Sequence, residues 1–201
     1  MKSGKNQLLI TLGGNMLKQA LLIIDAQQDL IEGNEEEQGV YEKEKLVNNM
    51  NVVIEKAISE SISVVFIRDI DVSNGEGPGF QIHRDIRVPS TAIIFDKAAT
   101  NSFYGTPLHE HLSENHVNHI VMMGCKTEHC IDTAVRTATI NHFDVTLVGD
   151  GHSTSDSKNL SAKQIILHHN EILHGHYNID NFSIVRNANE ELFSPVHDNY
   201  R

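Results

Sequence analysis

The stretch M-M-G-C-K-T-E-H-C-I-D-T-A-V-R-T-A, from Met122 to Ala138, predicts a strand, a sharp turn and the start of a helix. The apolar run before Gly124 is typical of a buried strand, and apolar residues recur at helical spacing from Ile131 onward. With Thr127 as the N-cap, we expect Cys130 in the first helical turn, as its third residue. The helix dipole and free backbone N–H groups there would lower the pKa of the thiol, so Cys130 is a candidate nucleophile.

Both cysteines also have ordinary explanations. Free cysteines are most often small buried hydrophobic residues, and this alternative stays open for Cys130. Cys125 fits a buried strand end better than a redox partner of Cys130, although thiol-based redox sensing through the pair remains an alternative. The chain has two cysteines in all, close together in sequence, which is no disulfide framework. A reducing, cytoplasmic setting is therefore expected.

Length and composition limit the classes of protein that this chain can belong to. The 201 residues, 39% of them hydrophobic, suit a single α/β domain. No apolar run approaches membrane-spanning length. The net charge of −11 and the absence of a basic cluster argue against nucleic acid and membrane surfaces as partners. We interpret residues 1–15 as a peripheral N-terminal leader and residues 16–201 as one domain.

Short apolar runs alternate with amphipathic segments along the chain. We expect strands at 21–24, 62–67, 91–95, 120–123, 143–148 and 182–185. Helices are expected at 45–58, 106–114, from 127, and 160–173. Gly149-Asp150-Gly151 should end the fifth strand, and the acidic segment 33–38 reads as a solvated loop. This order predicts right-handed βαβ units and a parallel, doubly wound α/β sheet.

Three chemically distinct residues are expected at one edge of this sheet. In open α/β sheets, ligands bind beyond the carboxyl ends of the strands. Asp25, Lys97 and Cys130 follow the first, third and fourth predicted strands. Taken singly, the aspartate suits a turn and the lysine suits a surface. Together they provide a carboxylate base, a cation and a thiol.

Three sequence blocks resemble signatures of the isochorismatase-like cysteine hydrolases. They are L-L-I-I-D-A-Q-Q-D-L (21–30), F-D-K-A-A-T-N-S-F-Y-G-T (95–106) and G-C-K-T-E-H-C-I-D-T-A (124–134). They occur in the family's order, and the similarity extends from about residue 19 to 185. The resemblance implies a three-layer fold with a six-stranded parallel sheet, order 3-2-1-4-5-6, flanked by helices. It also implies a homo-oligomer, a dimer or larger.

The resemblance further implies an Asp–Lys–Cys triad carried by Asp25, Lys97 and Cys130. Cys130 would attack the carbonyl of a small amide-like substrate, and a thioester acyl-enzyme would then be hydrolysed. A cis peptide bond between Cys125 and Lys126 is also implied, with the backbone N–H groups of Lys126 and Cys130 directed at the oxyanion. By position within or near the matching blocks, Leu30, Phe80, Phe103 and Tyr104 are candidate substrate contacts, although core packing explains each at least as well.

The sequence departs from the family's metal-dependent nicotinamidases. Those enzymes carry Asp-x-His and two further histidines between their second and third strands. Here Asp69-Ile70-Asp71 stands at the position of Asp-x-His, and His83 is the only histidine before the third strand. We therefore expect no metal and no other cofactor, as in the metal-free, streptothricin-hydrolase-like branch. The histidines at 168, 169, 174 and 176 suit surface or packing positions better than a metal site.

Two other functions remain open from the sequence. Some family members have glycine in place of the nucleophile and hydrolyse the vinyl ether of isochorismate, and Cys130 argues against that reaction. A non-catalytic member could use the same pocket to bind a small ligand, which the intact triad argues against.

Overall fold

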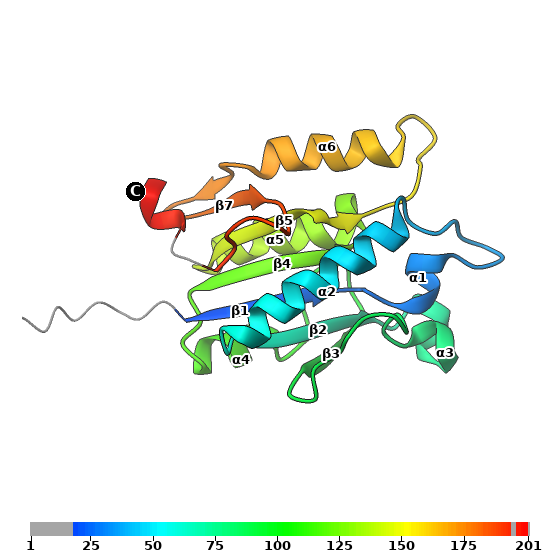
Figure 1. Cartoon of the computed structure of the whole chain (residues 1–201), viewed down its shortest axis with the longest axis horizontal. Helices are drawn as coiled ribbons and strands as arrows, with labels where there is room; N and C mark the ends of the chain where they lie inside the picture. The colour runs from blue at the N-terminus through cyan, green and yellow to red at the C-terminus, as the bar shows by residue number, and fades with distance from the viewer. Residues whose placement is uncertain (1–17, 194–195, 201) are drawn as a thin grey trace, which may run out of the picture.

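The computed structural model describes residues 18–193 and 196–200, and its main feature is one mostly parallel sheet (Figure 1). The strand order is β3-β2-β1-β4-β5-β7-β6. The strands are β1 (Gln19–Ile24), β2 (Ser63–Asp69), β3 (Ile93–Lys97), β4 (His119–Cys125), β5 (Asp144–Ser153), β6 (Tyr177–Asn178) and β7 (Asn181–Arg186). Six are parallel in the predicted order, with β7 in the place of the expected sixth strand. The two-residue β6 adds a seventh, antiparallel strand, so the predicted fold class is confirmed.

Helices cover both faces of this sheet, as Figure 1 shows. The longer ones are α2 (Lys43–Ser59), α4 (Leu108–Glu114), α5 (Asp132–Ile140) and α6 (Ala162–Leu173). Short helical segments are α1 (Gln28–Glu32), η1 (Val72–Gly75), α3 (Gly77–Phe80), η2 (Thr127–Ile131) and η3 (Val196–Tyr200). Helix α2 packs on one face of the sheet, whereas α4 and α5 pack on the other.

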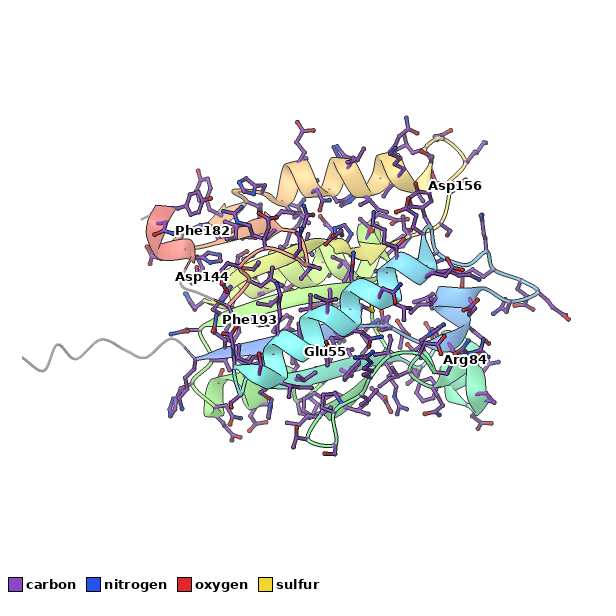
Figure 2. The ribbon with its side chains drawn as sticks, viewed as in Figure 1. Glu55, Arg84, Asp144, Asp156, Phe182 and Phe193 are labelled. Carbon is purple, nitrogen blue, oxygen red and sulfur yellow. The ribbon has the colours of Figure 1, made fainter. Side chains whose placement is uncertain are left out.

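The central strand β1 is apolar because both of its faces are buried. Leu21 and Ile23 pack into the core beneath α2, while Leu22 and Ile24 pack into the core beneath α4 and α5. Side chains alternate between the two faces of a strand, so a strand covered on both sides needs an unbroken apolar sequence. Phe193, labelled in Figure 2, contributes to the α2 core from the segment after β7.

Strand β5 is longer than the sequence predicts. Gly149-Asp150-Gly151 was expected to end it, but it continues to Ser153. Its pairing with β4 has an irregularity between Met122 and Gly124, and then resumes with Gly124 opposite His152. Pairing with the neighbouring strand therefore overrides the weak strand propensity of glycine, and β5 brings His152 next to the turn that follows β4.

Gly124 sets how closely β4 approaches β1. Its φ is +137°, and a Cβ built at this position would lie 1.9 Å from the carbonyl oxygen of Ile24. Ile24 is its partner in the parallel register of the two strands. Only glycine fits here, because a side chain would separate the two strands whose ends carry Asp25 and the turn with Cys130.

The interpretation of residues 1–15 as a leader concerns residues that lie outside the described part of the chain. The division into a leader and a domain of residues 16–201 therefore stays a prediction. In the described ranges, no helix combines the length and the apolar character needed to cross a bilayer.

Candidate active site

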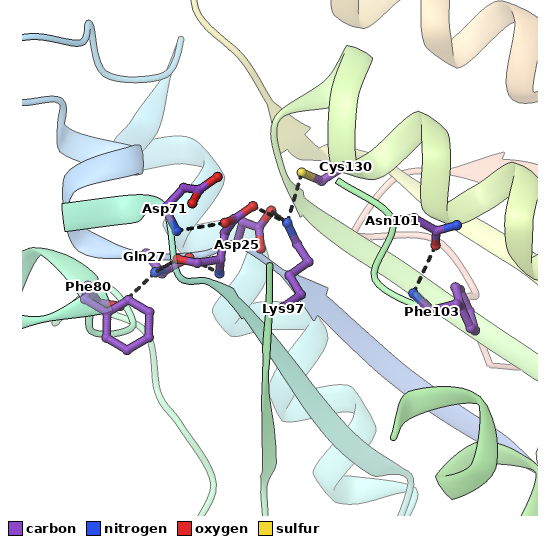
Figure 3. A network of polar contacts seen from close by, with 9 residues as sticks. Asp25, Gln27, Asp71, Phe80, Lys97, Asn101, Phe103 and Cys130 are labelled. Carbon is purple, nitrogen blue, oxygen red and sulfur yellow. Dashed lines mark hydrogen bonds and ion pairs between the residues drawn. The ribbon is translucent and has the colours of Figure 1, made fainter. Parts of the chain in front are cut away.

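The three predicted site residues lie together at the carboxyl edge of the sheet (Figure 3). Asp25 directly follows β1, Lys97 is the last residue of β3, and Cys130 lies in η2, between β4 and α5. The Nζ atom of Lys97 lies 3.0 Å from Oδ2 of Asp25 and 3.3 Å from Sγ of Cys130. All three residues are buried, with exposed fractions of 1%, 1% and 8% for Asp25, Lys97 and Cys130.

The turn that carries Cys130 differs from the predicted helix start. Thr127 is not the N-cap: Lys126 takes that position, and Thr127 is the first residue of the π-helical turn η2. Cys130 is thus the fourth residue of η2 rather than the third of an α-helix. The Thr127 hydroxyl pairs with Nδ1 of His152 at 2.9 Å instead of capping the helix, a tertiary contact that local sequence does not reveal. The peptide bond between Cys125 and Lys126 is cis, as the resemblance implied.

Burial is the largest single influence on the pKa values of these three groups. It raises the pKa of Asp25 to about 6, although the Lys97 charge opposes this shift. Burial, together with the negative charge of Asp25, raises the pKa of the Cys130 thiol to about 12, against the opposing effect of Lys97. For Lys97 itself burial lowers the pKa, but the charges of Asp25 and Cys130 outweigh it and the net shift is upward. The expected lowering of the thiol pKa is therefore wrong for the resting site, because desolvation outweighs the favourable position of the cysteine.

A fourth residue, Asp69, completes the polar cluster. Its carboxylate binds the Lys97 ammonium group, which also contacts Asp25 and Cys130. Gln27, which is fully buried, fixes the Asp69 backbone: its Nε2 donates to the Asp69 carbonyl at 3.0 Å, and its Oε1 accepts from the Asp69 N–H at 2.7 Å. The same Nε2 donates to the carbonyl of Phe80 at 2.9 Å. The sequence pattern drew attention to Asp69 only as part of the stretch at the position of the metal-binding Asp-x-His, and it gave no role to Gln27.

A second buried hydrogen-bond network connects η2 to β5 and α6. His152 contacts the Thr127 hydroxyl through Nδ1, and its Nε2 lies 2.9 Å from Oδ1 of Asn170. Asn170 in turn donates from Nδ2 to the carbonyl of Gly149 at 2.9 Å. Burial lowers the pKa of His152 to about 4, so the ring is neutral at pH 7. This residue was also missed, because β5 was expected to end before it.

A cavity of about 420 Å³ opens onto the cluster. It is lined by Asp25, Asp29, Leu30, Asn34, Glu36, Glu37, Asp69, Asp71, Val72, Ser73, Asn74, Lys126, His129 and Cys130. Of the four predicted substrate contacts, Leu30 is the one that lines it. The acidic segment expected to be a solvated loop is exposed, as predicted, and also supplies Glu36 and Glu37 to the cavity wall.

The three predicted aromatic contacts lie elsewhere. Phe80 is buried beneath the guanidinium group of Arg68, which lies 4.3 Å from the ring centroid. Phe103 stacks on Phe143 with ring centroids 6.2 Å apart, as part of the core. Tyr104 is 73% exposed. None of the three lines this cavity, and their contact with a substrate stays a prediction.

The donor set suits a buried ammonium group rather than a metal ion. One carboxylate oxygen each of Asp25 and Asp69 and the Cys130 sulfur lie within 4.8 Å of one another, the one such group among the described residues. Lys97 contacts all three, and its positive charge repels a cation from that position. His83 lies apart, with Nε2 3.0 Å from a carboxylate oxygen of Glu32.

Comparison with known proteins places this chain in a class of hydrolases. The isochorismatase domain matches residues 19–167, and the chain therefore belongs to the isochorismatase family of hydrolases. The chain is similar to an uncharacterized isochorismatase family protein, YrdC, from Bacillus subtilis (strain 168), at 26% identity over 66% of this chain and 72% of that protein. It is also similar to streptothricin hydrolase from Streptomyces noursei, at 25% identity over 69% of this chain and 55% of that enzyme.

A solved structure supports the fold. The crystal structure of N-carbamoylsarcosine amidase from Thermoplasma acidophilum superposes with a TM-score of 0.70, covering 87% of this chain and 99% of that one. The sequence identity is 21%, so this likeness concerns the fold alone.

Proposed function

We propose that this chain is a cysteine hydrolase that cleaves an amide-type C–N bond of a small molecule through a thioester acyl-enzyme. The observation that carries the proposal is the position of the buried Lys97 ammonium group, 3.0 Å from the Asp25 carboxylate and 3.3 Å from the Cys130 sulfur. A base, a cation and a thiol in contact are what nucleophilic catalysis by cysteine requires.

The first half of the reaction begins with a protonated thiol. At neutral pH Asp25 is ionised and Cys130 is not, since their pKa values are about 6 and about 12. Asp25 therefore takes the thiol proton as the sulfur attacks the substrate carbonyl, and Lys97 stabilises the developing thiolate. The backbone N–H groups of Lys126 and Cys130 are the proposed donors to the oxyanion. Asp25 then gives its proton to the leaving nitrogen, and the C–N bond breaks.

The second half uses the same groups. Asp25, ionised again, takes a proton from a water molecule that attacks the thioester carbonyl. The carbon–sulfur bond breaks, the acid is released, and the proton returns to the Cys130 sulfur. The amidase and hydrolase names of the compared proteins are in keeping with this chemistry. The Cys130 thiol beside the Lys97 ammonium group favours this route over the vinyl ether reaction of family members that have glycine at the nucleophile position.

The test is to trap the acyl-enzyme. Wild-type protein is screened against small primary amides for ammonia release, and the active amide is then mixed with enzyme and quenched in acid. Intact-mass analysis should show the added mass of the acyl group, located on the peptide with Cys130. Cys130→Ala should release no ammonia and form no adduct while keeping its circular dichroism spectrum. Turnover that persists in this variant would refute the proposal, whereas unchanged turnover in Cys125→Ala is the matched control.

A further inference from the structure

Carboxylates dominate the wall of the cavity above Cys130. Six of them line it, namely Asp25, Asp29, Glu36, Glu37, Asp69 and Asp71. Two lysines offset them: Lys97 binds Asp25 and Asp69, and Lys126 binds Glu37. A concave site with an excess of one charge concentrates ligands of the opposite charge.

Three of these carboxylates form no ion pair with a described residue. In the described part of the chain, no lysine, arginine or histidine forms an ion pair with Asp29, Glu36 or Asp71. Asp29 accepts a hydrogen bond from the Ser73 hydroxyl at 2.5 Å, which leaves its negative charge in place. These residues come from α1, the loop after it and the segment after β2, so three segments of the chain contribute negative charge to the cavity wall.

A buried acceptor at the floor of the cavity is an independent indication of a ligand. Among the described residues, none forms a hydrogen bond with Oδ1 of Asp25, although Asp25 is 1% exposed and lines the cavity. A buried carboxylate oxygen without a partner is costly unless a donor from outside the protein reaches it. In the proposed reaction, the water molecule that attacks the thioester is such a donor, because Asp25 takes its proton.

We propose that the substrate is a cationic amide: it carries a protonated amine or similar group on the part that extends from the scissile bond toward Glu36 and Asp71. This inference rests on the proposed hydrolase function for the position of the scissile bond. Substrates with a carboxylate at that end are excluded by repulsion from the same wall.

Three compounds that differ in one terminal group test the proposal. 6-Aminohexanamide, heptanamide and pimelic acid monoamide share five methylenes and a primary amide, and end in an ammonium, a methyl and a carboxylate group. Binding is measured by calorimetry to full-length Cys130→Ala, which cannot turn them over. We expect the ammonium compound to bind about tenfold or more tightly than heptanamide, and the carboxylate compound to bind most weakly.

Matched variants locate the preference. Adding Glu36→Gln and Asp71→Asn should weaken binding of 6-aminohexanamide by about fivefold or more and leave heptanamide unchanged. Glu110→Gln with Glu171→Gln, which removes two exposed carboxylates outside the cavity, should change neither. Equal or tighter binding of heptanamide or the monoamide, no binding of the ammonium compound, or a preference that survives Glu36→Gln and Asp71→Asn would overturn the proposal. Because binding is measured without turnover, failure of the hydrolase proposal in the trapping experiment is a separate result.

Discussion

Asp69 binds the ammonium group of Lys97, the same group that contacts the candidate nucleophile. The lysine is thus held between two carboxylates, Asp25 and Asp69, rather than paired with one. The negative charge of Asp69 also contributes to the raised pKa of Asp25, after the larger effect of burial. Two neighbouring charges of opposite sign, Lys97 and Asp69, therefore tune the candidate base in opposite directions.

Cys130 should react faster as pH rises through the pKa of Asp25, and this rising part of the pH profile is its acid limb. Removing the Lys97 cation should shift the acid limb to higher pH. Asp25 must be ionised to take the thiol proton, so reactivity falls as pH drops through about 6. In Lys97→Met the carboxylate loses the charge that lowers its pKa, and the limb should rise by about one unit or more. The rate of iodoacetamide alkylation at Cys130, followed by peptide mass spectrometry from pH 4.5 to about 9, gives this profile. A profile unchanged in Lys97→Met would contradict the assignment.

Removing the second carboxylate should have the opposite effect. Asp69→Asn eliminates a negative charge that raises the pKa of Asp25. It also makes Asp25 the one carboxylate that pairs with Lys97 in the described cluster. The acid limb of the same alkylation profile should therefore move below pH 6, by about half a unit to one unit. Asp71→Asn, which changes a neighbouring carboxylate without a Lys97 contact, is the control. An upward shift in Asp69→Asn would show that the charge balance around Asp25 is misassigned.

Chelators should leave hydrolysis unchanged. The ammonium group of Lys97 contacts the three potential ligands, Asp25, Asp69 and Cys130, so a divalent ion would have to displace a buried cation. We expect activity before and after dialysis against EDTA to agree, and added Zn²⁺ or Mn²⁺ not to raise it. Loss of activity on chelation with recovery on one metal would identify a metal-dependent enzyme.

The buried His152 should make stability depend on pH. Its pKa is about 4 in the fold, because burial disfavours the charged ring, and it returns to the ordinary value of 6.5 on unfolding. A lowered folded pKa means that stability is complete above 6.5 and is lost as pH falls toward 4. From pH 7.5 to 5.0 this histidine should account for a loss of about 2 kcal/mol in the free energy of unfolding.

Urea denaturation at the two pH values measures this contribution. His152→Gln should be less stable at pH 7.5, because the contacts with Thr127 and Asn170 are changed, and its stability should vary less with pH. His168→Gln, at an exposed position on α6, should behave like the wild type. Equal pH dependence in wild type and His152→Gln would refute the buried neutral ring.

Glycine should be indispensable at 124 and replaceable at 105. Both have positive φ, +137° and +69°, but a Cβ at Gly124 would lie 1.9 Å from the Ile24 carbonyl oxygen, and one at Gly105 meets no atom within 4 Å. Gly105→Ala should cost about 1 kcal/mol of backbone strain. Gly124→Ala should cost about 4 kcal/mol or more, or prevent folding. Similar urea midpoints for the two variants would contradict the close approach of β1 and β4.

The sequence by itself determined the parallel α/β sheet and the meeting of Asp25, Lys97 and Cys130. Apolar runs specify strands buried on both faces, and carboxyl ends of parallel strands share one edge, so residues that follow them come together. The tertiary structure decided what these residues are next to. Burial, not helix position, controls the Cys130 thiol; Asp69 and Gln27 complete the lysine's surroundings; and pairing with β4 extends β5 through its glycines to His152. Desolvation and long-range contacts depend on segments far apart in the chain, so local sequence patterns do not predict them.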